Sequence, residues 1–287
     1  MRSKLSVCVA FCAIACLLPA TALAKPTSKK TPTTYYLALG DSLSRGAQPN
    51  AQGITLPTNQ GYANFLYASE KQKIKGLKLE QLGCLGETTT SMLSGGKFCS
   101  YSAGSQLKAA LKFIAKHKIA FVTLDIGAND IDGCVSSTGT IDLACITAGV
   151  NTIKANVPTI VQKLRKAVGS KVKIAAMTYY DPFLGLYLQG STGQGDATLS
   201  VSLAKSVNGT LASDFMAQKL RVADVATAFG TYEPFTTTVT TSTGTEPAAV
   251  ANICKLTWMC AAAPVGPNIH ATVAGYKEIA KVFAAAL

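Results

Sequence analysis

The sequence lacks several of the patterns on which common binding functions depend. It has two histidines in 287 residues, and its cysteines beyond residue 24 form no C-x-x-C pair, which argues against the usual zinc sites. Lysine and arginine are not clustered among aromatic residues, so we expect them on solvated faces and predict no nucleic-acid partner. The chain also has no repeat of fixed period, which argues against a solenoid. We therefore expect no metal site.

The sequence also has no apolar run long enough to span a membrane, although it begins with a shorter one. Residues 5–18 are apolar or cysteine except for one serine, and Arg2 and Lys4 precede them. A spanning helix needs about 20 apolar residues. Small residues follow and end in an A-x-A motif at Ala24. The pattern predicts a secretory signal peptide over residues 1–24, cleaved near Ala24, with no stable membrane span afterwards.

A lipoprotein anchored at Cys16 is a weaker alternative, because Ala13 stands where leucine is expected. Residues 25–34 are rich in Lys, Thr, Ser and Pro and read as a flexible lead-in. Residues 35–287 are long enough for one α/β domain, which we expect to be a monomer. We expect the mature protein to be secreted, either to the periplasm or to the extracellular space.

Six cysteines remain beyond the predicted signal peptide. An even number in an exported chain favours disulfides, although six cysteines allow 15 connectivities. The short separations favour pairing in sequential order, namely Cys84–Cys99, Cys134–Cys145 and Cys254–Cys260.

Apolar runs alternate with amphipathic stretches along the rest of the chain, which predicts a parallel sheet covered by helices. We expect Pro158 to interrupt one of the helices. Two segments poor in apolar residues, 190–195 and the threonine-rich 235–246, are expected to be surface loops bordering a substrate cleft. Strands are expected at residues 35–39, 121–126, 172–177 and 220–225, and helices at 103–117, 144–168 and 274–287.

Polar residues follow the two clearest strands, at the edge where α/β sheets bind ligands. Ser42 comes just after the first strand, where its hydroxyl would be exposed and its own amide could stabilise an oxyanion. The alternative is a serine that only caps the next helix. Asn129 follows the other strand, where its side-chain amide could donate to the same oxyanion or simply occupy a tight turn.

A backbone donor and a proton acceptor complete such a site. Gly86 lies in a glycine-bearing loop whose amide could approach a substrate oxygen, and the alternative is a simple turn before a short helix. Of the two histidines, His117 falls in a lysine-rich helical stretch. His270 lies in a loop before the last helix and is the better general base.

Taken together and in this order, these residues resemble the sequence blocks of the SGNH (GDSL-type) hydrolases. The blocks are Gly40-Asp41-Ser42-Leu43, Gly86, Gly127-x-Asn129-Asp130 and His270, and the resemblance runs from Leu37 to Tyr276. It implies a three-layer α/β/α flavodoxin-like sandwich with a central parallel sheet. It also implies Ser42 as nucleophile, His270 as base, and an oxyanion hole formed by the Ser42 and Gly86 amides and the Asn129 side chain.

The sequence departs from the family pattern at one position. Members commonly have an aspartate three residues before the histidine, where this chain has Pro267. Something must still fix the imidazole tautomer. Either a backbone carbonyl or an acid from elsewhere in the chain could do so. We expect a backbone carbonyl within residues 258–267, because the expected Cys254–Cys260 bridge would fix that loop. Asn268 is not at the spacing of a triad acid, so we do not include it in a triad.

The resemblance implies an ester hydrolase that needs no cofactor and acts on lipid esters, short-chain esters or acylated sugars. An apolar stretch that could line an acyl pocket favours an esterase or lipase, although the same stretch could be a buried strand end. The resemblance is also compatible with a carbohydrate acetylesterase or acyltransferase, and with a non-catalytic binding protein on the same scaffold. The apolar stretch consists of Tyr179, Tyr180, Phe183, Leu184, Leu186 and Tyr187.

Overall fold

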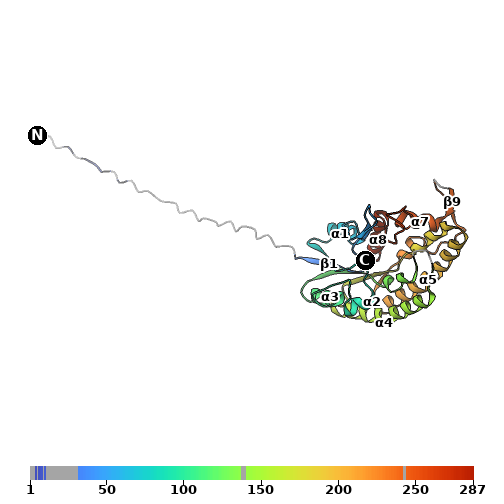
Figure 1. Ribbon diagram of the computed structural model, residues 1–287. Coiled ribbons are helices and arrows are strands. Elements are labelled where there is room, and N and C mark those ends of the chain that lie inside the picture. Colours follow the sequence, from blue (N-terminus) through green and yellow to red (C-terminus); the bar gives the residue numbers. More distant parts are fainter. Residues whose placement is uncertain (1–3, 5, 9, 11–31, 137–139, 242–243) are drawn as a thin grey trace. The chain divides into compact units, whose positions relative to one another are not determined.

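The computed structural model describes residues 4, 6–8, 10, 32–136, 140–241 and 244–287, and residues Pro32–Leu287 form one compact unit (Figure 1). The strands are β1 (Thr34–Gly40), β2 (Gln48–Pro49), β3 (Thr55–Leu56), β4 (Leu77–Gln81), β5 (Ile119–Asp125), β6 (Lys173–Met177), β7 (Arg221–Ala223), β8 (Thr238–Thr241) and β9 (Gly244–Pro247). The α-helices are α1 (Tyr62–Lys73), α2 (Thr89–Ser94), α3 (Gln106–Ile114), α4 (Leu143–Val168), α5 (Gly190–Ala217), α6 (Val225–Ala228), α7 (Ala248–Leu256) and α8 (Val273–Ala286). Three short 3₁₀ segments are η1 (Ala128–Asp130), η2 (Asp132–Cys134) and η3 (Pro182–Gln189).

The central sheet has five parallel strands in the order β4-β1-β5-β6-β7. The first strand, β1, therefore lies in the interior of the sheet. β4 pairs with one side of β1, and β5, β6 and β7 follow in order on the other side. This is the doubly wound, flavodoxin-like order, in which ligands bind beyond the carboxyl ends of the strands where the winding reverses. That switch point lies between β1 and β5.

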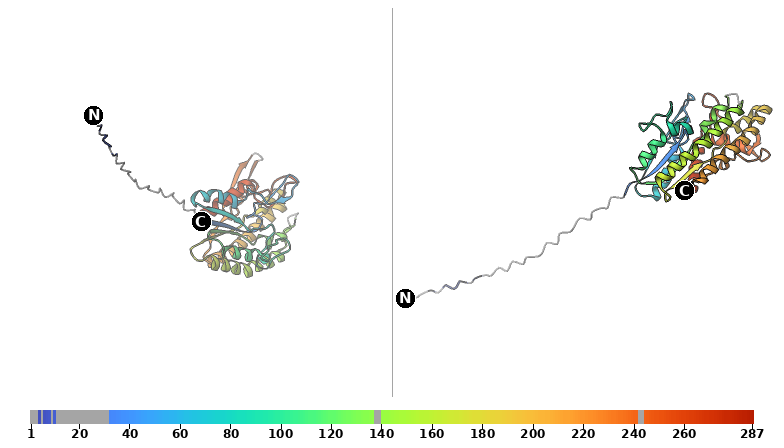
Figure 2. Two further views of the ribbon diagram at one scale, coloured as in Figure 1. Left: turned by 90° about the vertical axis from the view of Figure 1, so that its left-hand side faces the viewer. Right: turned by 90° about the horizontal axis from the view of Figure 1, so that it is seen from below.

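Helices cover both faces of the sheet, as the alternating side chains of β1 show. Tyr36 and Ala38 pack in a core with α1 and α8, whereas Leu37 and Leu39 pack in a second core with α3, α4 and α5. The views in Figures 1 and 2 show the sheet between these two helical layers. The predicted three-layer α/β/α fold is confirmed.

Two predictions about helices are wrong for a shared reason, which is tertiary packing. α4 continues through Pro158, because the buried Val157, Ile160 and Val161 around it pack on the sheet and offset the one lost backbone hydrogen bond. Residues 190–195 begin α5 instead of forming a loop. A side chain at Gly193 would meet the Leu186 carbonyl oxygen at 2.1 Å, so glycine lets this helical turn pack closely on η3.

Three strand features were not predicted, and the first is the short antiparallel pair β2 and β3. β4 is an edge strand whose residues alternate between apolar and polar, as in Leu77 and Lys78. Because it contains no continuous apolar run, the apolar pattern does not predict it. The threonine-rich segment 235–246 contributes the antiparallel pair β8 and β9, not only a loop.

The predicted signal peptide, residues 1–24, lies outside the described residues except for positions 4, 6–8 and 10, and so does most of the lead-in. No helix in the described part of the chain is long and apolar enough to span a membrane.

Candidate active site

Ser42 and His270 lie 228 positions apart in the sequence and are in direct contact in the structure. The Ser42 Oγ atom is 2.9 Å from His270 Nε2. Ser42 follows β1, and His270 lies in the loop before α8, which packs on the same sheet. Burial lowers the pKa of His270 to about 4, so the imidazole is neutral at neutral pH and its Nε2 can accept a proton.

The backbone around Ser42 is fixed by the end of β5. The Asp125 carboxylate accepts hydrogen bonds from the backbone amides of Asp41 and Ser44, both at 3.1 Å, and Tyr62 donates its hydroxyl to the same carboxyl group. Gly40 has φ +135°, and a side chain there would meet the Asp125 carbonyl oxygen at 2.1 Å. The first residue of the Gly40-Asp41-Ser42-Leu43 block must therefore be glycine so that β1 and β5 can pack closely.

Asp41 stabilises the turn that carries the serine. Its carboxylate accepts the backbone amide of Leu43 at 2.9 Å and the hydroxyl of Tyr179 at 2.7 Å. Burial raises the pKa of the Asp41 carboxyl, and these hydrogen bonds oppose the rise. Both of its oxygens are engaged in positioning the chain, and neither contacts His270.

The group on the other ring nitrogen of His270 differs from the prediction. Asn268 Oδ1 lies 2.8 Å from His270 Nδ1, so among the described residues a side-chain amide, and not a backbone carbonyl, orients the ring. The Trp258 carbonyl, within the predicted segment, instead accepts the amides of Asn268 and Ala261. The expectation failed because it assumed the spacing of an acid three residues away. An asparagine two residues away reaches the ring by folding back over its own turn, where it also accepts the His270 amide at 3.0 Å.

Three backbone and side-chain donors were predicted to face an oxyanion. In the described part of the chain, the amides of Ser42 and Gly86 donate to no protein acceptor. The Asn129 side chain donates one N–H to the Glu87 carbonyl at 3.0 Å, which leaves its second N–H free. Ser42, Asn129 and His270 line one pocket, and Gly86 directly precedes Glu87, whose carbonyl accepts the Asn129 N–H.

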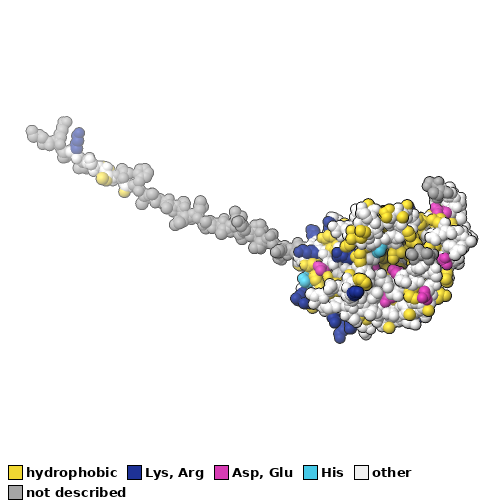
Figure 3. All heavy atoms as spheres, in the orientation of Figure 1, with side chains coloured by type: hydrophobic (Ala, Val, Ile, Leu, Met, Phe, Trp, Pro, Cys, Tyr) yellow, Lys and Arg dark blue, Asp and Glu magenta, His cyan; other side chains and the backbone are white. Residues whose placement is uncertain are grey.

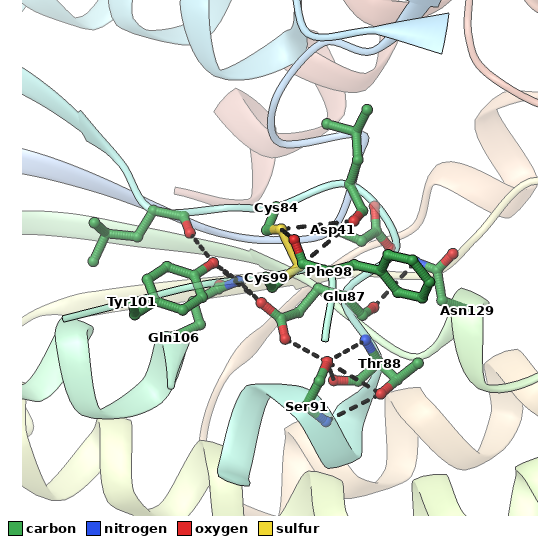
Figure 4. Close-up of a disulfide and its surroundings, with 12 residues drawn as sticks. Asp41, Cys84, Glu87, Thr88, Ser91, Phe98, Cys99, Tyr101, Gln106 and Asn129 are labelled. Atoms are coloured by element: carbon green, nitrogen blue, oxygen red, sulfur yellow. Dashed lines mark hydrogen bonds between the residues drawn. A yellow bond between two sulfur atoms is a disulfide. The ribbon is translucent and has the colours of Figure 1, made fainter. Parts of the chain in front are cut away.

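The loop that carries Gly86 is held by a disulfide and by a buried carboxylate (Figure 4). Cys84 is bonded to Cys99 across 15 residues. Glu87 accepts hydrogen bonds from Gln106 at 2.8 Å and Tyr101 at 3.1 Å, and Ser91 donates to its other oxygen. Gln106 in turn bonds both the amide and the carbonyl of Gly40, and so connects this loop to the end of β1.

The structure pairs the other four cysteines as Cys134–Cys145 and Cys254–Cys260, which is the sequential order. The first bridge joins η2 to the first turn of α4, and the second joins α7 to the loop that leads to His270. The one cluster of candidate metal ligands among the described residues is Cys84, Glu87 and Cys99. Because both of its sulfurs are in a disulfide, the cluster fits no metal ion.

A largely apolar pocket opens beside Ser42 and His270. Tyr179, Tyr180 and Phe183 line it, as the predicted acyl-pocket stretch requires. Leu184 and Leu186 are instead buried in the fold, and Tyr187 stacks on Phe235. The remaining apolar lining residues come mainly from the η1–η2 segment, α4 and α5, and they are Leu43, Ala128, Ile131, Val135, Ile141, Ile146, Pro182, Leu203, Ala204, Val207 and Ile269.

Sequence reasoning missed the side chains that support the site. Asp125, Gln106 and Thr55 carry no motif of their own, and only the folded arrangement shows what they bind. Asp130 belongs to a motif block, but its carboxylate binds the amide and hydroxyl of Thr89 at the start of α2, so its contacts are structural.

Several solved structures share this fold at low sequence identity. An extracellular lipase from Streptomyces rimosus is 18% identical, with 89% of this chain and 100% of that chain covered at a TM-score of 0.54. Phospholipase A1 from Streptomyces albidoflavus is 19% identical over the same shares, with a TM-score of 0.55. The acetylxylan esterase Axe2 from Geobacillus stearothermophilus is also 19% identical, over 88% and 94%, with a TM-score of 0.51.

None of the curated proteins matches the sequence significantly. The family described as GDSL-like Lipase/Acylhydrolase matches residues 36–283, a span that includes every residue of the site described above. This chain therefore belongs to the GDSL-like lipase/acylhydrolase family and is an ester hydrolase.

Proposed function

We propose that the protein is a secreted, monomeric serine carboxylic-ester hydrolase that acts through an acyl-enzyme on Ser42, with His270 as general base. The observation that carries this proposal is the 2.9 Å contact between Ser42 Oγ and His270 Nε2 at the mouth of an apolar pocket. A hydroxyl in contact with a neutral imidazole is the arrangement that nucleophilic acyl transfer requires.

The reaction follows from these positions. His270 Nε2 takes the Ser42 proton as Oγ attacks the ester carbonyl carbon. The developing oxyanion is stabilised by the free amides of Ser42 and Gly86 and by the free N–H of Asn129. The imidazolium then gives its proton to the departing alcohol, which leaves an acyl group on Ser42. A water molecule, deprotonated by His270, repeats the sequence and releases the acid.

The pocket supports an acyl chain as the group bound beside Ser42. Most of its lining side chains are aliphatic or aromatic, and they surround a smaller number of polar ones, which is typical of a pocket that binds an apolar group. This favours an esterase or lipase over a carbohydrate acetylesterase. The same chemistry would serve acetylated sugars, so the two functions differ in the ester they prefer.

Secretion is supported by the sequence pattern of residues 1–24 and by three disulfides, which persist in oxidising compartments. The mature protein would begin near residue 25. Mass spectrometry of the protein recovered from the culture medium or periplasm would give that terminus directly, and an intact residue 1–24 segment on the exported protein would contradict cleavage.

The test of the proposed function is hydrolysis of p-nitrophenyl esters from acetate to palmitate. Ser42→Ala and His270→Ala should each lower kcat by at least about 10³-fold, because each removes a group that acts in the transition state. His117→Gln is the matched control and should retain activity, since His117 bonds to the Phe113 carbonyl and packs on the rings of Phe113 and Tyr35, which are not part of the site. Full turnover in Ser42→Ala would contradict the proposal. A preference for acetylated xylan over every p-nitrophenyl ester would favour the acetylesterase.

A further inference from the structure

Asn268 occupies the place beside His270 that a carboxylate commonly holds in a serine hydrolase. Its Oδ1 atom lies 2.8 Å from His270 Nδ1 and 3.0 Å from the backbone nitrogen of the same histidine. Its Nδ2 atom donates to Thr55 Oγ1 at 2.9 Å, across 213 residues of sequence. The oxygen of the Asn268 amide thus contacts His270, and its nitrogen contacts Thr55 on β3.

One of these partners determines which end of the amide faces the ring. The His270 backbone N–H can only donate, so the atom facing it must be the oxygen of Asn268. Turning the amide over would set its NH₂ group against that N–H, whereas the Thr55 hydroxyl can either accept or donate and so fits both orientations. Because Oδ1 can only accept, His270 Nδ1 must carry the proton. His270 Nε2 then presents its lone pair to the Ser42 hydroxyl.

We infer that Asn268, held by Thr55, is the positioning residue that keeps His270 in the tautomer required of a general base. The inference rests on the proposed function for its catalytic meaning. In a serine-protease triad, exchanging the carboxylate for an amide costs about 10⁴-fold in kcat, because the ring then adopts the wrong tautomer. Here the backbone N–H of His270 prevents that outcome by selecting the amide oxygen.

The backbone on both sides of the asparagine is also fixed. The Asn268 amide donates to the Trp258 carbonyl at 3.1 Å, and the Trp258 amide donates to the His270 carbonyl at 2.9 Å. Tyr180 donates its hydroxyl to the Ile269 carbonyl at 2.8 Å. With the chain held at three successive residues, the asparagine side chain has little freedom to leave the ring.

A neutral group at this place has an electrostatic consequence. Burial lowers the pKa of His270 to about 4, and within the described part of the chain no carboxylate hydrogen-bonds to the ring to oppose this. The segments 257–272 and 46–61, which carry His270 and Thr55, contain no charged residue. The other ionisable side chains that line the pocket do not hydrogen-bond to the imidazole, and they are Asp41, Asp132, Tyr179, Tyr180 and Asp181.

The first test compares pH profiles of kcat/KM on a p-nitrophenyl ester. The wild-type acid limb should fall near pH 4, where His270 becomes protonated. Asn268→Asp should stay active and shift that limb upward by about 1–3 pH units, because a carboxylate stabilises the imidazolium. Asn268→Leu should lower kcat by about 10²–10⁴-fold with little change in KM. A profile that does not move in Asn268→Asp would overturn the inference.

Thr55→Val is the second variant, because it keeps the shape of the side chain and removes only the acceptor of Asn268 Nδ2. We expect a kcat loss smaller than that of Asn268→Leu, and Thr55→Ser should restore activity. Wild-type kcat in both Asn268→Leu and Thr55→Val would contradict a positioning role. Any variant that fails to fold would be recognised by its circular dichroism, and the Thr55 pair would then decide the question.

A measurement that needs no activity separates this inference from the proposed function. The ring-nitrogen NMR shifts of His270 report which nitrogen is protonated, and His117→Gln leaves His270 as the one histidine of the chain. The inference predicts a proton on Nδ1 in this background and a mixture of tautomers when Asn268→Leu is added. A proton on Nε2 would overturn the inference even in an active enzyme. A proton on Nδ1 in a protein that hydrolyses no ester would contradict the proposed function and leave the positioning intact.

Discussion

At the scale of single residues, Asp132 is a carboxyl group placed in largely apolar surroundings. It lines the apolar pocket on η2, and it has no side-chain hydrogen bond within the described residues. Burial, aided by the nearby charges of Asp41 and Asp130, raises the pKa of Asp132 to about 7. The folded protein thus holds this proton more tightly than the unfolded chain does, so its ionisation at higher pH costs stability.

Asp132→Asn should therefore stabilise the protein in alkaline solution. The free-energy gain should be near zero at pH 4, grow as the pH rises toward 7, and reach about 1–3 kcal/mol above that pH. For a domain of this size the gain corresponds to about 2–4 °C in Tm per kcal/mol. Thermal unfolding at pH 4.5 and pH 8.5 measures it, with Asp196→Asn outside the pocket wall as the charge-matched control. Equal gains at both pH values would contradict the account.

The residues that bear the chemistry could be identified from the sequence because they follow strands. Ser42 and Asn129 come just after β1 and β5, and a parallel sheet places both at one edge. The role of Asn268 could not be identified in this way. Its contact with His270 depends on a turn of two residues and on Thr55, which lies far away in the sequence. The family pattern places an acid three residues before the histidine, and this pattern includes neither Asn268 nor Thr55.

At the scale of the elements, α5 supplies one wall of the pocket. Leu203, Ala204 and Val207 of this helix face the pocket. Because Ala204 is the smallest of them, a larger side chain there would fill space that a long acyl chain needs. The choice of acyl chain is thus expected to depend on one face of one helix.

Ala204→Phe should lower kcat/KM for the octanoate ester by at least about 10-fold and change that for acetate by much less, since each buried methylene group contributes about 0.8 kcal/mol. The ratio of the two rates measures the effect independently of enzyme concentration. Ser202→Phe, at an exposed position of the same helix, is the matched control and should leave the ratio unchanged. An unchanged ratio in Ala204→Phe would show that the acyl chain binds elsewhere.

The Cys84–Cys99 bridge stabilises the loop that carries Gly86. Replacing both cysteines by alanine should lower the free energy of unfolding by about 3 kcal/mol, as expected for a loop of this length. The Cys254–Cys260 bridge closes a loop of 6 residues, and its double alanine variant should lose about 2 kcal/mol. Urea denaturation of both variants gives the two values. A larger loss for the shorter loop would contradict an origin in chain entropy.

The elements themselves were predictable where local pattern and tertiary packing agree. β1, β5 and α8 meet this condition, and each lies within two residues of its predicted bounds. Pro158 and Gly193 are exceptions, because each usually breaks a helix and here lies within one. Burial on both sides of Pro158 and the close approach of η3 to Gly193 outweigh the local preference.

At the scale of the whole molecule, the basic side chains do not line the pocket, whose charged lining residues are acidic. Lys and Arg side chains gather at the end of the molecule near α3 (Figure 3), and Lys108, Lys112, Lys116 and Lys118 are all exposed. This agrees with a solvated face. The pocket beside Ser42 opens at the carboxyl edge of the sheet, and its lining contains no lysine or arginine.

The doubly wound sheet accounts for the whole arrangement. Because strands are added on both sides of β1, the carboxyl ends of β1 and β5 lie next to each other. The loop between α7 and α8 then places His270 against Ser42. The alternation of apolar runs and helices predicts the parallel sheet. It does not predict β4, an edge strand in which Leu77 is buried and Lys78 is exposed.

The most direct test of the central claim is covalent labelling with a fluorophosphonate, which reacts with activated serines, followed by peptide mapping. The account predicts one adduct, on Ser42, that forms in the wild-type protein, is absent in Ser42→Ala and forms much more slowly in His270→Ala. An adduct on another serine, or no adduct in a folded wild-type protein, would contradict it.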